Sequence, residues 1–243
     1  MKKTIVLTDG RAPRELIRAL ALRGWTTVEL PAHPGLGAGV CSHTDMLIAR
    51  IEKRIISLAS YADAVPALFD DLYSLLAPHG FSFTLLGDEV TEKYPGDARL
   101  NALVMGDTVL YNPRSLSEGL ADAYLAAGKR LVRVKQGYPA CTVLPLGVGA
   151  AATADRGMAK ALASEGIRVT LIEEGHILLP PYEYGFIGGC AGRLGDTVYF
   201  TGRIEDHPSY GAIKAAAEAE GLATESLTDL PLVDLGGLLF IEV

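Results

Sequence analysis

Cys141 and His43 are the residues of this sequence with the clearest chemical potential. Cys141 follows the stretch 135–140, whose glycine and proline predict a junction between two strands, and such junctions often carry functional residues. A thiolate nucleophile needs a partner that moves protons, and histidine does this near neutral pH. His43 and Asp45 begin an extended run, in which residues two apart point to the same face, so we expect both at one site.

The three cysteines compete for the role of nucleophile. A buried structural thiol is the commoner role of a lone cysteine, and His43 is what favours catalysis for Cys141. Cys190 is the rival nucleophile, since neighbouring glycines such as Gly189 let backbone approach a ligand closely, although they serve close packing equally well. Cys41 is interpreted as a loop residue.

Two other kinds of site are weaker interpretations. His43, Asp45 and Cys141 are metal-ligand types, but the spacing of a zinc motif is missing, and we predict no metal. Residues 147–152 resemble a dinucleotide-binding turn, yet they lead into a strand-like run instead of a helix, so a turn between strands is favoured. We therefore expect no cofactor.

Composition limits the partners. The chain has 243 residues, a net charge of -7 and a pI near 5.3, and its lysines and arginines are scattered, which argues against a nucleic-acid surface. No apolar run reaches the roughly 18 residues of a membrane span, and no secretory leader is recognisable. Three cysteines without CxxC spacing fit reduced thiols, so we expect a cytoplasmic protein that does not bind membranes.

Short strands and helices alternate along the chain. Helices are predicted over residues 13–22, 65–76, 116–127, 155–164 and 208–220, with Gly24, Gly128, Gly166 and Gly221 as stops. Strands are predicted over residues 4–7, 26–30, 46–50, 55–58, 82–86, 97–104, 108–111, 130–134, 141–146, 149–153, 167–172, 197–201, 223–227 and 238–243.

The elements repeat. Units begin near residues 43, 97, 141, 185 and 234, a spacing of roughly 44 to 54 residues that is typical of radial or solenoid repetition. The last unit has only one strand, and the first thirty residues supply the missing strand, helix and strand. Pairing of 238–243 with 4–7 would close five ββαβ units into a ring without an exposed edge. The alternative is a doubly wound open sheet.

Several motifs match a known fold family. They are His43-Thr44-Asp45-Met46, Tyr94-Pro95, Asn101-Ala102, residues 134–138 with Cys141, and residues 185–189. The five units, with His-x-Asp opening one unit and a cysteine opening the unit two further on, resemble the pentein fold of guanidino-group modifying enzymes, which include arginine and agmatine deiminases, dimethylarginine dimethylaminohydrolases and amidinotransferases. More narrowly, the motifs named above are similar to a bacterial family grouped with that fold. The resemblance implies an α/β propeller with a pseudo-fivefold axis, formed by residues 1–243 as a single domain.

The resemblance also implies roles for residues. Penteins use a cysteine nucleophile, a histidine acid/base in a His-x-Asp element two units earlier, and a carboxylate-Gly-Gly element in the unit before the histidine. Cys141, His43 and Asp45 match the first two elements. The stretch 234–237 matches the third loosely, because one residue separates Asp234 from the glycines. The order is circularly shifted, since the familiar enzymes end on the cysteine unit.

The predicted ligand is a small guanidino compound. A guanidinium carbon is a poor electrophile, so a thiolate must attack it while carboxylates hold the planar cation. Asp234 and Asp97 open neighbouring units and are expected to add negative charge at the axis. The remaining predicted substrate-binding residues are Asn101, Gly189 and Cys190.

Two functions remain open at this point. The first is a hydrolase or amidino transferase that acts through a covalent Cys-His mechanism, with Cys141 as nucleophile and His43 as acid/base. The second is a non-catalytic binding protein, a role that the same ring fold has in a ribosomal anti-association factor. The acidic composition argues against a ribosome-binding patch. The distance between His43 and Cys141 distinguishes the two functions. Sequence alone gives neither the substrate nor the oligomeric state.

Overall fold

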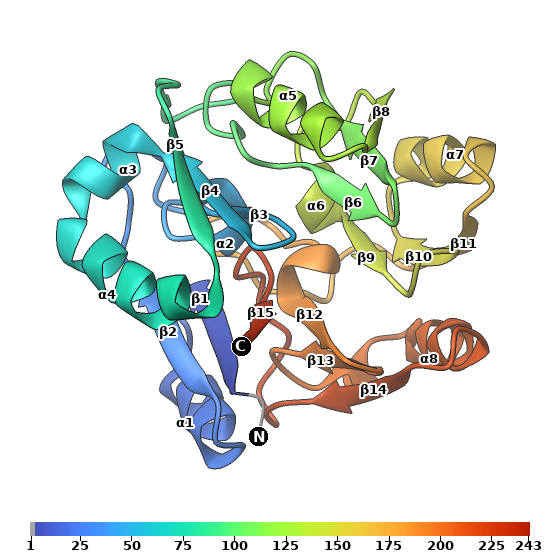
Figure 1. The fold of residues 1–243 in the computed structure, drawn as a ribbon. Helices are drawn as coiled ribbons and strands as arrows, with labels where there is room; N and C mark the ends of the chain where they lie inside the picture. The colour runs from blue at the N-terminus through green and yellow to red at the C-terminus, as the bar shows by residue number, and fades with distance from the viewer. Residues whose placement is uncertain (1–2) are drawn as a thin grey trace.

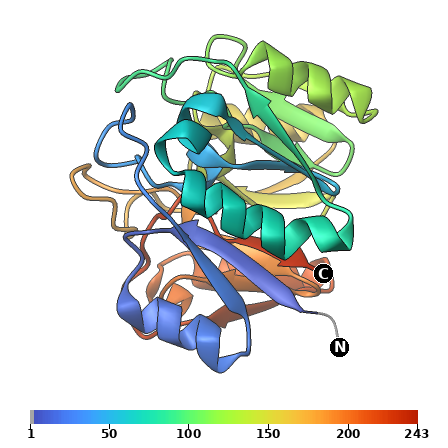
Figure 2. The same cartoon turned by 60° about the vertical axis from the view of Figure 1, so that its left-hand side comes forward.

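The structure is a computed structural model that describes residues 3–243, and its strands form five separate three-stranded sheets. Figure 1 looks along the axis of a ring, with the sheets around the centre, the longer helices at the rim and the short helices α2 and α6 near the middle. The rotated view in Figure 2 shows α1, α4 and α5 on the outside of the sheets. The doubly wound alternative is therefore wrong, because no continuous sheet joins the units.

All five units have one topology. The first strand pairs antiparallel with the second, and the second pairs parallel with the third after a helical crossover. This is the predicted ββαβ order. β1 (Thr4–Asp9), the central strand of its sheet, is buried at every residue, so this apolar run has no alternating pattern.

The elements divide among the units as follows. Unit I contains α2 (Thr44–Leu47), β3 (Ala49–Ile51), β4 (Arg54–Leu58), α3 (Ala59–Ala64), α4 (Pro66–Leu76), η1 (Ala77–His79) and β5 (Ser82–Leu86). Unit II contains β6 (Leu103–Met105), β7 (Thr108–Tyr111), α5 (Glu118–Ala126) and β8 (Arg130–Arg133). Unit III contains α6 (Pro139–Thr142), β9 (Val143–Pro145), β10 (Ala150–Thr153), α7 (Arg156–Ser164) and β11 (Arg168–Leu171).

The last two units complete the ring. Unit IV contains η2 (Gly188–Cys190), β12 (Ala191–Leu194), β13 (Thr197–Phe200), η3 (Ile204–Asp206), α8 (Tyr210–Ala219) and β14 (Ala223–Ser226). Unit V contains β15 (Leu239–Glu242), β1, α1 (Arg14–Leu22) and β2 (Thr26–Leu30). In unit V, Thr4 lies opposite Glu242 and Leu7 opposite Leu239, so the predicted closure of the ring is confirmed.

A glycine in the left-handed conformation follows the crossover helices of every unit. Gly24, Gly80, Gly128, Gly166 and Gly221 follow the helices of the five units, each with a φ between 73° and 82°. This left-handed conformation is strained for residues with a Cβ, so glycine ends the helix and redirects the chain toward the third strand. Four of these stops were predicted from the sequence.

Three predicted strands differ from the structure near the axis. Residues 44–47 form the helical turn α2, and the strand begins only at Ala49. Cys141 lies in the helical turn α6 and not at the start of a strand. Of the predicted strand 97–104, only the end is extended, in β6. In each case the chain turns at the axis before it enters the sheet, and turns this short leave almost no periodic signal.

The turns at the axis approach one another closely. A Cβ on Gly188 would lie 2.3 Å from the carbonyl oxygens of Ala140 and Val143, so units III and IV touch through backbone. A Cβ on Gly236, whose φ is 68°, would lie 2.6 Å from the Cβ of His43. Only glycine allows these contacts, and they bring residues of four units to one centre.

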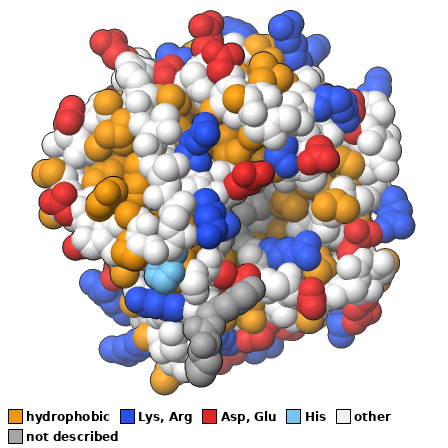
Figure 3. Space-filling model, viewed as in Figure 1, with side chains coloured by type: hydrophobic (Ala, Val, Ile, Leu, Met, Phe, Trp, Pro, Cys, Tyr) orange, Lys and Arg blue, Asp and Glu red, His pale blue; other side chains and the backbone are white. Residues whose placement is uncertain are grey.

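The face seen in Figure 1 has a hollow at its centre (Figure 3). A cavity of about 290 Å³ lies there, lined by β3, β6, β9 and the segment before β15, and we name it the axial cavity.

Among residues 3–243, no helix is long and apolar enough to cross a membrane.

Candidate active site

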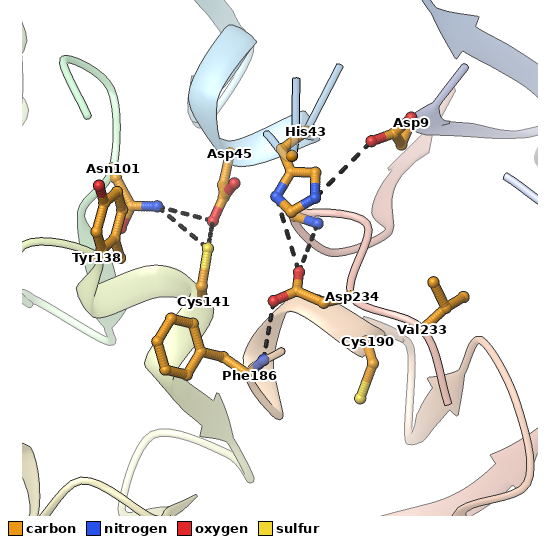
Figure 4. Close-up of polar contacts among 12 residues, drawn as sticks. Asp9, His43, Asp45, Asn101, Tyr138, Cys141, Phe186, Cys190, Val233 and Asp234 are labelled. Atoms are coloured by element: carbon orange, nitrogen blue, oxygen red, sulfur yellow. Dashed lines mark hydrogen bonds and ion pairs between the residues drawn. The ribbon is translucent and has the colours of Figure 1, made fainter. Parts of the chain in front are cut away.

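Two short helical turns deliver the predicted reactive residues to the axis. His43 immediately precedes α2, and Cys141 lies in α6. Asp45 lies in α2, so the expectation that it points to the same face as His43 along a strand is wrong. Successive residues of a helical turn diverge by about 100°, and Figure 4 shows Asp45 beside Cys141 while His43 points toward Asp234.

Cys141 belongs to a buried polar cluster with Asp45 and Asn101. Its thiol donates to Oδ2 of Asp45 at 2.6 Å. The Asn101 amide Nδ2 donates both to the same carboxylate oxygen at 2.8 Å and to the sulfur at 3.5 Å. The Asn101 Oδ1 accepts from the backbone N–H of Ala140, which fixes the amide orientation. Asn101 therefore ties the carboxylate and the thiol together.

His43 lies between two carboxylates. Its Nδ1 is 3.8 Å from Asp234 and its Nε2 is 3.8 Å from Asp9, and all three side chains are almost completely buried. Within residues 3–243, neither imidazole nitrogen makes a hydrogen bond. A neutral imidazole carries a proton on one nitrogen and can accept another at the second, and no hydrogen bond fixes which nitrogen of His43 is the acceptor.

Burial sets the protonation states of these groups. It lowers the pKa of His43, although Asp234 and Asp9 act in the opposite direction. It raises the pKa of Cys141 well above its ordinary value, and the neighbouring Asp45 adds to this increase. It also raises the pKa of Asp45 to about 7, against the hydrogen bond from Cys141. Without a ligand, the thiol is therefore protonated and His43 is neutral at pH 7.

Backbone groups hold Asp234 in place. Its Oδ2 accepts from the N–H of Phe186 at 2.9 Å and its Oδ1 from the N–H of Gly236 at 3.0 Å. A Cβ on Gly189 would lie 1.9 Å from Oδ1, so glycine is required there for the carboxylate to reach the centre. Gly189 thus acts through Asp234.

A second cavity, of about 300 Å³, opens onto Cys141, His43 and Asp234. Most of its wall is apolar or aromatic, and we name it the substrate cavity. The remaining lining residues are Val40, Met46, Tyr138, Leu179, Tyr182, Glu183, Tyr184 and Phe186. It shares no lining residue with the axial cavity, whose wall includes Asp45. The thiol therefore lies between the substrate cavity and Asp45.

The other predicted binding residues lie further away. Asp97 accepts a hydrogen bond from the Tyr138 hydroxyl at 2.7 Å, and it fixes a cavity-lining ring without lining the cavity itself. Cys190 is fully buried in an apolar cluster, where its thiol donates to the carbonyl of Ile187. Cys41 is half-buried and donates to the carbonyl of Ala38.

One set of side chains is suited to metal binding. One atom each of His43, Cys141 and Asp234 lie within 4.8 Å of one another. Nitrogen, sulfur and carboxylate oxygen are zinc ligands. The set includes Asp234 in place of the Asp45 considered from sequence. A metal there would occupy the atoms that a thiol mechanism needs.

Asp9 is the residue that sequence reasoning missed. It is fully buried at the end of β1 and is held by Arg11, whose Nη2 lies 2.5 Å from Oδ2. Asp9 lies just behind the predicted strand 4–7, but only the ring geometry brings the end of β1 beside His43.

Comparison with known proteins places this geometry in context. Residues 7–239 match a protein family that is described as a family of unknown function (DUF6873). The chain belongs to this family. No curated protein matches the chain in sequence.

The solved structures that share this fold include an amidinotransferase, a DDAH and an arginine dihydrolase. SxtG, an amidinotransferase of saxitoxin biosynthesis from Microseira wollei, aligns over 93% of this chain and 78% of its own, with a TM-score of 0.57 and 12% identity. A mutant of DDAH from Pseudomonas aeruginosa in complex with citrulline aligns over 94% and 93%, with a TM-score of 0.57 and 12% identity. The N-terminal domain of the cyanobacterial arginine dihydrolase ArgZ, bound to product, aligns over 99% and 97%, with a TM-score of 0.55 and 13% identity. The predicted pentein fold is confirmed.

Proposed function

We propose that this DUF6873 member is an enzyme that hydrolyses a guanidino compound, or transfers its amidino group, through a covalent bond to Cys141. The observation that carries the proposal is the meeting of Cys141, His43 and Asp234 within 4.8 Å at the floor of a cavity. The structural neighbours are enzymes of guanidino chemistry, which supports the same general class of activity.

Binding of the substrate activates the thiol in this proposal. A guanidinium ion at the cavity floor donates N–H groups to Asp234 and places its positive charge beside the sulfur. That charge offsets the burial that raises the pKa of Cys141. The thiol proton passes to the neutral imidazole of His43, and the imidazolium is stabilised by Asp9 and Asp234 on its two sides.

The departure of that proton also frees Asp45. Oδ2 of Asp45 loses the hydrogen bond from the thiol and accepts an N–H of the guanidinium instead, while Asn101 keeps the carboxylate in place. Two carboxylates then fix the planar cation so that its carbon faces the sulfur. Asp45 contacts the substrate only after the thiolate has formed.

The chemical steps follow from this arrangement. The thiolate forms a bond to the guanidinium carbon, and one C=N electron pair moves to nitrogen. His43 gives its proton to the departing amine, the C–N bond breaks, and a cationic thiouronium remains on Cys141. His43 next takes a proton from water as the oxygen adds to the carbon. The C–S bond then breaks, the hydroxyl proton leaves to solvent, and His43 returns its proton to the thiolate, so that a neutral ureido product is released. If an amine adds in place of water, the outcome is amidino transfer.

Alkylation with 2-chloroacetamidine tests the proposal, because this probe has an amidinium group and no tail. 2-Chloroacetamide is the matched neutral probe. We expect saturable labelling of Cys141 by the amidine across pH 6 to 9, roughly the window of thiol titration. Rates are measured by peptide mass spectrometry. Asp234→Asn should reduce the preference for the amidine by about tenfold, which corresponds to ~1.4 kcal/mol.

Equal and slow labelling of Cys41, Cys141 and Cys190 by both probes would contradict the proposal. The ring would then be a binding scaffold with a degenerate centre, which is the second function that the sequence allows.

A further inference from the structure

The wall of the substrate cavity indicates which chemical groups the ligand has beyond its guanidino group. Above the reactive floor, the wall consists of the aromatic rings of Tyr138, Tyr182, Tyr184 and Phe186, together with aliphatic side chains. The cavity volume of about 300 Å³ is at the lower end of the range typical for small-ligand sites. It suits a slender chain that is packed along apolar surfaces.

The charges along this wall have one sign. Among the described residues 3–243, those that line the cavity include the acids Asp234 and Glu183 and contain no lysine or arginine. Glu183 is exposed, between two tyrosines of the wall. Arg11, which influences the charge balance at His43, is already bound by the carboxylate of Asp9 and by the carbonyl oxygens of Ala38 and Gly39.

The aromatic rings are held in place. Tyr138 donates to Asp97 and lies next to Tyr94, with 5.8 Å between ring centroids. Tyr182 lies against Gly39, where a Cβ would come within 2.2 Å of its ring. Fixed rings whose faces are rich in π electrons attract cations, and this attraction is larger when the ring is partly desolvated.

We propose that the substrate is a guanidine with an apolar chain that ends in a second positive charge and has no carboxylate. An amino-acid substrate would bring its carboxylate to a wall with acids and electron-rich aromatic rings and no cationic partner, and the like charge of Glu183 would repel it. A terminal ammonium meets Glu183 and the tyrosine rings. This inference rests on the function proposed above, because it assumes that the guanidino group lies at Cys141.

Binding to the Cys141→Ser variant, measured by calorimetry, tests the inference without turnover. Three ligands share one guanidino end: 4-aminobutylguanidine, its neutral-tailed analogue pentylguanidine, and arginine. We expect 4-aminobutylguanidine to bind at least about tenfold more tightly than arginine. Glu183→Gln should weaken its binding by about 3- to 5-fold, as for a partly exposed charge pair, and leave pentylguanidine unchanged. Glu218→Gln on α8 removes an equal charge far from the cavity and controls for long-range effects.

Equal or tighter binding of arginine would overturn the inference, and so would a loss on Glu183→Gln that is shared by pentylguanidine. Tight binding of 4-aminobutylguanidine without labelling or turnover of the wild-type protein would contradict the proposed catalysis and still support the proposed ligand class. If none of the three ligands binds, both proposals fail.

Discussion

Cys141 and Cys190 occupy equivalent places in neighbouring units and have different surroundings. Each lies in a short turn at the axis, directly before the first strand of its unit, and each is buried with its pKa raised by that burial. Cys141 contacts Asp45 and Asn101 and faces a cavity, whereas the thiol of Cys190 has a backbone carbonyl as its partner. The fold therefore offers the same position at least twice, and the polar neighbours distinguish Cys141, the proposed nucleophile, from the packed Cys190.

Replacement of each cysteine by alanine gives the largest contrast. Loss of a nucleophile typically costs on the order of 10⁶-fold in kcat, and we expect Cys141→Ala to abolish turnover of a guanidine substrate. Cys190→Ala should keep turnover within about threefold, because its sulfur does not reach the substrate cavity. Steady-state assays of both variants measure this contrast. Comparable losses of turnover in the two variants would show that Cys141 and Cys190 do not differ in function.

His43→Asn tests whether the partner of Cys141 moves protons. General acid–base groups typically contribute about 10²- to 10⁴-fold, and we expect kcat to fall by that factor. Labelling by 2-chloroacetamidine should also slow, since the neutral imidazole no longer accepts the thiol proton. His79→Asn, at an exposed site at the end of η1, is the matched control. A normal kcat in His43→Asn would exclude it as the acid/base.

Asp45→Asn should change the two labelling rates in opposite directions. The charge of Asp45 raises the pKa of Cys141, so its removal should lower that pKa and speed labelling by neutral 2-chloroacetamide at pH 7 to 8. The cationic probe loses a carboxylate and should react about 10- to 100-fold more slowly than with wild type. A change in the same direction for both probes would show that Asp45 does not hold the cation.

Asp45→Asn should also change how the free energy of unfolding depends on pH. The pKa of Asp45 is raised to about 7 in the folded protein, so the folded state binds an extra proton between about pH 4 and 7. The stabilisation is present at low pH and is lost as pH rises through 7, by at most ~4 kcal/mol. Asp45→Asn should lack this loss in urea unfolding at successive pH values. His43, with a lowered pKa, gives the opposite slope in both proteins and cancels in the comparison.

The smallest expected effect is the loss of stability in Cys190→Ala. Cys190→Ala leaves a small void in the apolar cluster of unit IV, and we expect about 1 kcal/mol of destabilisation in urea unfolding, in the usual range of single substitutions. Cys41→Ala, at a half-buried loop residue, should be closer to neutral. If Cys190→Ala were as neutral as Cys41→Ala, the packing role of Cys190 would be wrong.

The sequence predicts the repeating parts of this molecule better than its centre. Strand and helix periodicity, together with glycine stops such as Gly166, recur in every unit and predict the ring and its closure. Residues 44–47 and 139–142 form single helical turns, too short for periodicity, so the separation of Asp45 from His43 could not be predicted.

The candidate site was predicted in part for the same reason. Cys141, His43 and Asp234 meet because of unit order, which a sequence can reveal. Asp9, at the end of β1, and Phe186, in the segment before η2, join them through geometry that depends on the whole ring. Asp97 and Cys190 were placed by unit position alone, and the structure puts a tyrosine ring and an apolar cluster around them.

The closing sheet has a consequence for the order in which the molecule folds. Pairing of residues 4–7 with 239–242 joins segments separated by almost the whole chain, and contacts of such long range tend to form late. Cys141, Asp45 and Asn101 come from units I to III, which are consecutive along the chain, whereas both acidic neighbours of His43 belong to unit V and its approach to the axis. The thiol cluster can therefore assemble during folding before the imidazole acquires its flanking carboxylates, and closure of the ring also brings together the groups of the proposed proton transfer.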